Sequence, residues 1–179
     1  CPGARNSALT IAFTSNSNFI TTSHIDERSA GYFALGVSKE NNIPTVVITT
    51  SGTAVANLFP SIVESNLSRT PLIIITADRP DYLINKGENQ TINQKYIYGE
   101  HVRYFNDTGL PSEDFSSLEK GIGLSYQHSI GTKDMPPGAV HINPSEIVSG
   151  IMPAPGKLPP MHRLEQLFNR IGYAPDKHI

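Results

Sequence analysis

The chain has 179 residues, which is enough for one domain and a short part of a second. Its 14 Lys and Arg against 16 Asp and Glu give a formal net charge of −2, so it lacks the basic field that nonspecific nucleic-acid binding requires. No apolar run approaches the roughly 20 residues that span a bilayer, and the single cysteine, Cys1, excludes an internal disulfide. We therefore expect a cytoplasmic protein that neither binds nucleic acid nor inserts into a membrane.

The first part of the chain predicts a turn, a strand and a helix. The turn at Pro2-Gly3 is of a kind that ordinarily follows a strand, so we expect the first strand of the domain to be missing from this chain. Residues 19–25 have the composition of a short strand. From Ser29 onward, apolar residues recur at i, i+3, i+4 and i+7, which predicts a helix that ends near Asn41.

Two apolar runs in the middle of the chain predict buried strands. Residues 45–49 and 71–76 are nearly continuous in apolar or β-branched side chains, as is typical of strands that are covered on both faces. The turn 50–53 leads from the first run into a helical apolar stripe, which Pro60 should kink or split. The second run ends at Asp78-Arg79.

The later part of the chain is less regular. Residues 81–110 are polar with little periodicity, and a segment of this length without clear structure is often functional. Acidic residues follow Ser112, which predicts a helix from there to about residue 129. A third buried strand is predicted over residues 139–143.

The order of these elements predicts the fold class and the domain boundary. Alternating strands and helices favour an α/β fold with three layers, a mainly parallel sheet with helices on both faces. A Pro-rich stretch at 149–160 marks a boundary, and one more amphipathic helix follows it. We expect residues 1–150 to form one domain and residues 151–179 to be a linker and the start of a following domain.

The predicted turns place polar residues at one edge of the sheet. Glu27 follows the predicted strand 19–25, the turn 50–53 follows the predicted strand 45–49, and Asp78-Arg79 follows the predicted strand 71–76. Because carboxyl ends of parallel strands meet at one edge, a binding site is expected there. A carboxylate at that edge can be catalytic, although a Glu at a helix start is also favoured by the helix dipole alone.

Six motifs occur in order along the chain: Pro2-Gly3-Ala4-Arg5-Asn6, His24 to Gly31, Thr50-Ser51-Gly52-Thr53-Ala54, Thr76-Ala77-Asp78-Arg79-Pro80, Asn89-Gln90-Thr91-Ile92-Asn93-Gln94 and Val140-His141-Ile142-Asn143. Together they resemble the N-terminal part of the 2-succinyl-5-enolpyruvyl-6-hydroxy-3-cyclohexene-1-carboxylate synthases, thiamine-diphosphate-dependent enzymes of menaquinone biosynthesis. The resemblance implies a thiamine-diphosphate-binding fold, with residues 1–150 as its pyrimidine-binding domain. Cys1 stands where the family more often has Ser.

The resemblance implies cofactor-binding roles for four residues. Glu27 would pair with N1′ of the aminopyrimidine ring and so promote removal of the C2 proton of the thiazolium ring. This role needs a carboxylic acid in a fairly dry pocket. Pro2, Thr53 and Asn57 would shape the pyrimidine pocket. The turn 50–53 also resembles an anion cradle at a helix start, but the Gly-Lys-Ser/Thr ending of a P-loop is absent.

The resemblance also implies substrate contacts, each with a structural alternative. Arg5 would bind a substrate carboxylate, or it is a surface residue. Gln90 would line the pocket of the acceptor substrate, or its amide stabilises the loop. Arg79 would contact an anionic ligand, or it pairs with Asp78 or caps a helix.

The remaining polar and aromatic residues show no second site. The six histidines have no metal-ligand spacing, and we expect His24 and His141 to form hydrogen bonds within the fold. Tyr96, Tyr98 and Phe105, like Tyr104, are expected to pack or to form an interface. We expect no metal ligands in this chain, because the Gly-Asp-Gly motif that would hold the diphosphate through Mg²⁺ is absent.

For the whole enzyme, the resemblance implies decarboxylation of 2-oxoglutarate on thiamine diphosphate and addition of the succinyl group to isochorismate. It also implies a homodimer or homotetramer with active sites between subunits, and a Mg²⁺ and diphosphate site in a missing C-terminal domain. The present chain alone is then expected to be inactive and poorly stable. Two alternatives stay open: another thiamine-diphosphate enzyme, of the acetolactate-synthase or decarboxylase type, and a non-catalytic binding or assembly domain of the same fold.

Overall fold

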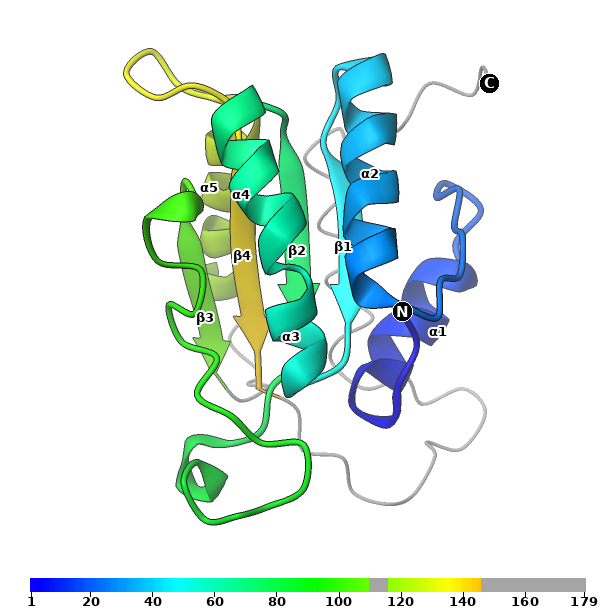
Figure 1. Cartoon of the computed structure of the whole chain (residues 1–179), viewed down its shortest axis with the longest axis vertical. Helices are drawn as coiled ribbons and strands as arrows, with labels where there is room; N and C mark the ends of the chain where they lie inside the picture. The colour runs from blue at the N-terminus through cyan, green and yellow to red at the C-terminus, as the bar shows by residue number, and fades with distance from the viewer. Residues whose placement is uncertain (110–115, 146–179) are drawn as a thin grey trace.

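A computed structural model describes residues 1–109 and 116–145 of the chain (Figure 1). Its sheet has four parallel strands in the order β1-β2-β4-β3. The strands are β1 (Thr45–Thr49), β2 (Leu72–Thr76), β3 (Phe105–Gly109) and β4 (Ala139–Pro144). The α-helices are α1 (Ser7–Thr14), α2 (Glu27–Asn41), α3 (Thr53–Asn57), α4 (Phe59–Ser68) and α5 (Ser116–Ile130). Short 3-10 helices are η1 (Ala4–Asn6), η2 (Asp81–Leu83) and η3 (Gly99–His101).

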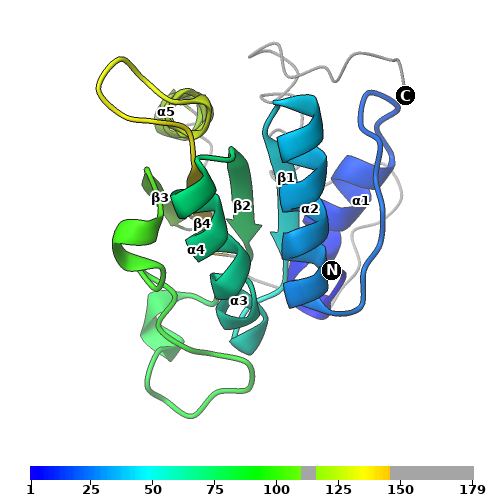
Figure 2. The same ribbon diagram turned by 45° about the horizontal axis from the view of Figure 1, so that its top comes forward.

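Helices cover both faces of this sheet, which confirms the predicted three-layer α/β fold (Figure 2). Alternate residues of β2 and β4 point to opposite faces, as strand geometry requires. One face packs on α1 and α5 through a buried cluster of Leu9, Phe13, Ile73, Ile75, Ile122, Val140 and Ile142. The other face packs on α2, α3 and α4 through a cluster that includes Leu35, Val47, Val55, Leu58, Ile62, Leu72 and Ile74.

The three predicted strands with apolar runs are confirmed as β1, β2 and β4. Every residue of β2 and β4 is buried, and Ile74 pairs with Val47 on one side and His141 on the other. These two central strands explain why the runs are continuous rather than alternating, since helices remove water from both faces.

The helices α2 to α4 follow their predicted signals. Asp26 is the N-cap of α2: its carboxylate accepts hydrogen bonds from the Ser29 amide at 2.7 Å and from the Ser29 hydroxyl at 2.8 Å. The helix ends at Asn42, which has a left-handed φ of 56°. Pro60 lies in the first turn of α4, so the predicted split of the middle helix is confirmed.

The predicted strand over residues 19–25 is wrong. This segment forms no strand, and the side chains of Ile20 and Ile25 are 75% and 101% exposed. Among the described residues, no neighbouring strand pairs with this segment. Residues that favour a strand form one only where a partner strand accepts and donates the backbone hydrogen bonds. Two elements were not predicted: α1, which follows the opening turn, and β3, which lies within the polar segment 81–110.

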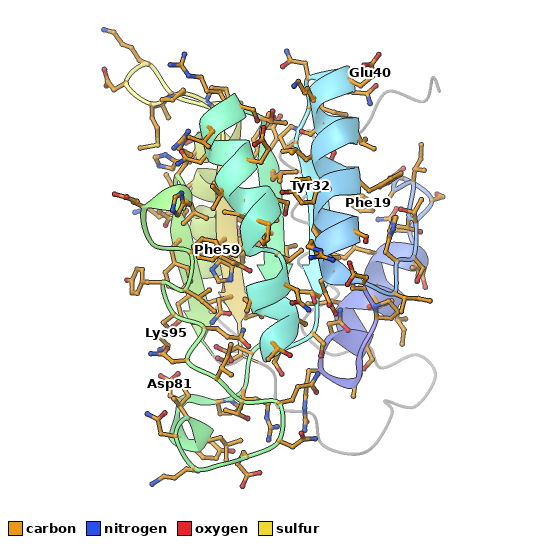
Figure 3. All side chains as sticks on the ribbon, in the orientation of Figure 1. Phe19, Tyr32, Glu40, Phe59, Asp81 and Lys95 are labelled. Carbon is orange, nitrogen blue, oxygen red and sulfur yellow. The ribbon has the colours of Figure 1, made fainter. Side chains whose placement is uncertain are left out.

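The polar segment between β2 and β3 is irregular but anchored. Tyr98 is fully buried, and its hydroxyl donates a hydrogen bond to the Val55 carbonyl of α3 at 2.7 Å. Lys95 lies 2.8 Å from a carboxylate oxygen of Asp81 and 2.8 Å from one of Asp107, which joins η2 to β3 (Figure 3). These contacts fix the segment without regular backbone hydrogen bonding.

Several predictions fall outside the described residues: the helix start at Ser112, the boundary at 149–160, the last amphipathic helix and the domain 151–179. The predicted end of this helix, near residue 129, is confirmed, because α5 ends at Ile130. Within residues 1–109 and 116–145, no helix has the length and apolar character needed to cross a membrane.

Candidate active site

Parallel pairing brings the carboxyl ends of all four strands to one edge of the sheet (Figure 1). The first residues of α2 and α3 lie at the same end of the molecule, close to the tip of β1 (Figure 1). Helix starts carry partial positive charge from their free amides, so this edge favours acidic side chains and anionic or polar ligands. The predicted site residues are distributed around this edge.

Glu27 is the first residue of α2 and is half-buried. It is placed there by the Asp26 cap, not by a preceding strand as predicted. The side-chain amide of Asn57, the last residue of α3, donates a hydrogen bond to Glu27 Oε2 at 3.1 Å. Within the described residues Glu27 Oε1 has no partner, so one oxygen is left for a ligand.

The Asp26 cap is itself electrostatically favourable. The hydrogen bond from the Ser29 amide, supported by that from the Ser29 hydroxyl, lowers the pKa of the Asp26 carboxyl from its ordinary value. Asp26 is therefore a carboxylate at neutral pH and keeps the first turn of α2 in place. Since Glu27 is in that turn, the cap sets the direction from which its side chain leaves the helix.

Gly31 lies one turn after Glu27 and is buried where α2 crosses α4. A Cβ atom at this position would collide with the Ser61 hydroxyl oxygen and lie 3.3 Å from Leu58 Cδ2. The absence of a side chain thus allows α2 to lie close to α4. This close approach brings the start of α2 near the end of α3, where Asn57 is found.

The opening turn lies along the end of β1. The Cys1 nitrogen donates to the Ile48 carbonyl at 3.0 Å, and a Cβ atom on Gly3 would lie 2.7 Å from Thr50 Cβ. Pro2, between them, is exposed. The Glu27 charge acts on the Cys1 amino group, whose pKa is lowered mainly by burial. The turn and the start of α2 are therefore neighbours, although they are far apart in the sequence.

Arg5 and two threonines complete this part of the edge. Arg5 is half-buried in η1, and its guanidinium has no hydrogen-bond or ion-pair partner among the residues that the structure describes. The hydroxyls of Thr49 and Thr50 are buried and also lack a partner within the same part of the chain. Unused donors and acceptors at a strand end are what a polar ligand requires.

The turn after β1 holds Gln90. The Ser51 hydroxyl donates to the Gln90 carbonyl at 2.9 Å, and a Cβ atom on Gly52 would lie 3.1 Å from the same oxygen. Gly52 has a φ of 81°, so both its conformation and its surroundings require glycine. Thr53 follows as the exposed first residue of α3.

Arg79 contacts the loop that carries Gln90, and neither predicted structural alternative describes it. Its guanidinium donates to the Asn89 carbonyl at 2.8 Å, and Asp78 accepts a hydrogen bond from the Arg79 main-chain amide at 2.7 Å. Among the described residues its guanidinium forms no ion pair with Asp78. Burial raises the pKa of the Asp78 carboxyl, against the opposing effect of a hydrogen bond from Asn143.

A buried polar cluster lies beneath these turns, and the sequence analysis assigned it no function. Thr76 donates to Asn143 Oδ1 at 2.8 Å, so its oxygen accepts from His141 Nε2 at 2.7 Å. His141 therefore carries a proton on Nε2, and because burial lowers its pKa to about 3, the ring is neutral at pH 7. The expected internal hydrogen bonds of the two histidines are confirmed, since His24 pairs with the Thr22 hydroxyl at 3.3 Å. The sequence feature that could have indicated this cluster is the presence of polar residues at the ends of the buried strands.

The structure thus assembles two groups of predicted site residues. Glu27 and Asn57 are joined directly, with the Pro2 turn beside them. Gln90 is held by Ser51 of the turn 50–53, and Arg79 donates to the carbonyl of the preceding residue, Asn89. No direct contact joins Glu27 to Gln90 within the described residues. In the same part of the chain, His, Cys, Asp and Glu side chains form no group of three or more that could hold a metal ion.

Comparison with known proteins gives consistent matches. Residues 1–97, which include every candidate residue from Pro2 to Gln90, match the family described as "Thiamine pyrophosphate enzyme, N-terminal TPP binding domain". A protein of Halobacterium salinarum named 2-succinyl-5-enolpyruvyl-6-hydroxy-3-cyclohexene-1-carboxylate synthase is 43% identical over 168 residues, which covers 89% of this chain and 28% of that protein.

Proteins of the same name match from other organisms. That of Chloroflexus aurantiacus is 43% identical over 150 residues, 80% of this chain and 24% of its own length. That of Bacillus velezensis is 41% identical over 143 residues, 80% of this chain and 25% of its own length. The chain therefore spans about a quarter of the relatives that it matches. It belongs to the thiamine pyrophosphate enzyme family and contains that family's N-terminal TPP binding domain.

Proposed function

We propose that this chain is the pyrimidine-binding part of a 2-succinyl-5-enolpyruvyl-6-hydroxy-3-cyclohexene-1-carboxylate synthase. The complete protein would decarboxylate 2-oxoglutarate and transfer the succinyl group to isochorismate in menaquinone biosynthesis. The observation that carries this proposal is the 43% identity, over 168 residues, with a protein of that name. The distribution of candidate residues around one sheet edge supports it.

The residues present suit the aminopyrimidine half of thiamine diphosphate. The ring has nitrogen donors and acceptors. The edge offers a half-buried carboxylate, one oxygen of which has no partner among the described residues, together with two threonine hydroxyls that likewise lack one there. When bound, thiamine diphosphate supplies a carbon nucleophile and an electron sink for the decarboxylation of a 2-oxo acid. Pro2, Thr53 and Asn57 would surround the ring, and Glu27 would meet its nitrogen.

Glu27 would act by holding a proton. Asn57 occupies Glu27 Oε2, which leaves Oε1 to share a proton with a ring nitrogen. Glu27 would give up and regain that proton during each turnover.

The cationic groups would bind the anionic substrates. The Arg5 guanidinium, which has no partner within residues 1–109 and 116–145, is suited to a carboxylate in a two-pronged contact. Gln90 would line the pocket for isochorismate, and Arg79 would orient the Gln90 loop or reach the substrate. We further propose that Mg²⁺ and the diphosphate are held by a later domain, that active sites form between subunits of a homodimer or homotetramer, and that the protein is cytoplasmic.

The test uses the complete protein with 2-oxoglutarate, isochorismate, thiamine diphosphate and Mg²⁺. Loss of isochorismate is followed for wild type, Glu27→Gln and Glu40→Gln. Glu40 is a matched control, because it is an exposed glutamate at the opposite end of the same helix (Figure 3). We expect Glu27→Gln to lower turnover by about 100-fold or more, and Glu40→Gln to leave it unchanged.

Other outcomes separate the alternatives. Cofactor-dependent consumption of a different 2-oxo acid, with isochorismate unchanged, would keep the cofactor and replace the substrates, as in an acetolactate-synthase or decarboxylase type of enzyme. Absence of any cofactor-dependent reaction in the wild type would favour a binding or assembly domain.

A further inference from the structure

Gln94 is completely buried and uses both ends of its side-chain amide. Its Oε1 accepts a hydrogen bond from the Gly52 amide at 2.9 Å. Its Nε2 donates to Asn143 Oδ1 at 2.9 Å and to the Ala77 carbonyl at 3.1 Å. One side chain therefore joins the carboxyl ends of β1, β2 and β4.

These partners permit only one orientation of the amide. Nε2 faces two oxygen acceptors, and Oε1 faces an N–H donor, so a flipped amide would oppose like groups on both sides. The orientation of Asn143 is fixed in turn, because its Nδ2 donates to Asp78 Oδ2 at 2.7 Å. A buried network in which each side-chain amide atom of Gln94 and Asn143 has a partner holds these two side chains in a single arrangement.

The same turn holds both ends of the segment from Gln90 to Gln94. Ser51 donates to the Gln90 carbonyl, and the adjacent Gly52 donates to the Gln94 side chain. This turn also begins α3, which carries Thr53 and ends at Asn57. The position of Gln90 is consequently tied to the helix on the cofactor side of the candidate site.

We propose that Gln94 is a positioning residue for the acceptor substrate: it fixes the loop bearing Gln90 to the turn that begins α3. This inference rests on the proposed function, in which Gln90 meets isochorismate, an acceptor with two carboxylates. Gln94 itself touches no substrate, since it is buried among the strand ends. Its removal should misplace Gln90 while leaving the groups around Glu27 in position.

The test compares three variants of the complete protein. Gln94→Met keeps the length of the side chain and loses its side-chain hydrogen bonds to the Gly52 amide, Asn143 and the Ala77 carbonyl, and Ser51→Ala removes only the bond to the Gln90 carbonyl. Lys95→Met is the matched control, because Lys95 lies in the same segment but pairs with Asp81 and Asp107. The measurements are kcat, KM for each substrate, and hydrogen exchange at the Gly52 amide.

We expect Gln94→Met to raise KM for isochorismate about tenfold, because small displacements of an orienting group have large effects. KM for 2-oxoglutarate should stay within about twofold of wild type, because Gln94 lies away from the groups near Glu27. The Gly52 amide should exchange faster in this variant. Ser51→Ala should change the isochorismate KM in the same direction by less, and Lys95→Met should change neither KM.

An equal rise of both KM values in Gln94→Met would overturn the inference, because it would indicate general loss of structure. An unchanged isochorismate KM in both Gln94→Met and Ser51→Ala would also overturn it. If the wild type does not consume isochorismate, the proposed function fails. Hydrogen exchange at the Gly52 amide then tests whether Gln94 positions the loop that bears Gln90. Faster Gly52 exchange in Gln94→Met but not in Lys95→Met supports the positioning role, and unchanged exchange in Gln94→Met contradicts it.

Discussion

Two asparagine–carboxylate pairs lie at the same edge of the sheet in opposite surroundings. Asn143 donates to Asp78 at 2.7 Å, with both side chains buried. Asn57 donates to Glu27 at 3.1 Å, with Asn57 exposed and Glu27 half-buried. Among the described residues, both carboxylate oxygens of Asp78 have a hydrogen-bond partner, whereas Glu27 Oε1 has none. The difference separates a pair that fixes the strand ends from a pair that can meet a ligand.

The largest effect on stability is expected from breaking the buried pair. Asn143→Leu deprives the buried Asp78 of its side-chain amide donor and removes one acceptor shared by Thr76 and Gln94. We expect a loss of about 3 kcal/mol in the free energy of opening this domain. Native-state hydrogen exchange of β2 amides in the complete protein measures this quantity.

A control for this variant lies in the same polar segment. Asn93 is exposed, and its side chain accepts a hydrogen bond from the Lys95 amide at 3.2 Å and has no other partner in the described part of the chain. Asn93→Ala should change the same free energy by less than about 0.5 kcal/mol. Equal losses in the two variants would remove the distinction between the buried cluster and its exposed surroundings.

The next effect depends on pH and comes from His141. Its folded pKa of about 3 lies below the ordinary value of 6.5, so the unfolded chain binds more protons between these pH values. The stabilisation that comes from neutral His141 is fully present above pH 6.5. Below pH 6.5 the free energy of unfolding falls by about 1.4 kcal/mol for each pH unit, down to about pH 3. Hydrogen exchange measured from pH 7 to pH 5 should show this slope in wild type.

The contribution of His141 is isolated by comparing slopes. His141→Gln keeps a donor for Thr76 and removes the titrating ring, so its stability should fall less steeply between pH 6.5 and pH 5. Asp78, whose pKa is raised, acts in the opposite direction in acid and is present in both proteins. Identical slopes for the two proteins would contradict a neutral buried His141.

A smaller effect is expected from the ion pairs of Lys95. The hydrogen bonds that Lys95 donates to Asp107 and Asp81 raise its pKa, so the stabilisation is present below pH 10.5 and is lost as the pH rises above it. Because Asp81 is 65% exposed, Lys95→Met should cost only about 0.5 to 1 kcal/mol, and less in 1 M salt. A cost that does not change with salt would indicate lost packing of the side-chain stem instead of lost charge.

Loss of the exposed Asn57–Glu27 hydrogen bond should have the smallest effect on stability and a clear effect on activity. Asn57→Ala should change the opening free energy by less than about 0.5 kcal/mol. Under the proposed function it should also lower kcat of the complete protein by about tenfold, since a hydrogen bond to a charged group is lost. Asn41→Ala, which alters an exposed asparagine in the last turn of α2, should leave kcat unchanged. An unaltered kcat in Asn57→Ala would mean that Asn57 does not orient Glu27.

The parts of the fold that were predictable share one physical property. β1, β2 and β4 are apolar because helices cover the sheet, so burial is recorded directly in their composition. β3, with the sequence Phe-Asn-Asp-Thr-Gly, pairs among the described residues only with β4. A half-exposed edge strand needs no apolar run, and nothing in its local sequence distinguishes it from a loop. The reverse error occurred at residues 19–25, where composition favours a strand that has no partner in the described part of the chain.

The candidate site was predictable in its location but not in its internal contacts. Carboxyl-end turns of parallel strands must meet, which accounts for Thr53 and Arg79, whereas Glu27 is placed by the Asp26 cap and Gln90 by an irregular loop. The Glu27–Asn57 hydrogen bond arises from the crossing of α2 with α4, which a one-dimensional pattern does not contain. Gln94 was visible only as one polar letter in a motif, because its importance comes from residues 42 and 49 positions away.

Gly31 affects how variants of this protein should be read. Because any side chain there meets Ser61, a substitution pushes α2 from α4 and moves Glu27 relative to Asn57. A mutational scan that scores growth alone would place residue 31 in the active site, although no ligand could reach it. Scans that record abundance and activity separately would instead assign it to the spacing between two helices. The same reasoning advises protein engineers to keep position 31 constant when they diversify the edge around Glu27.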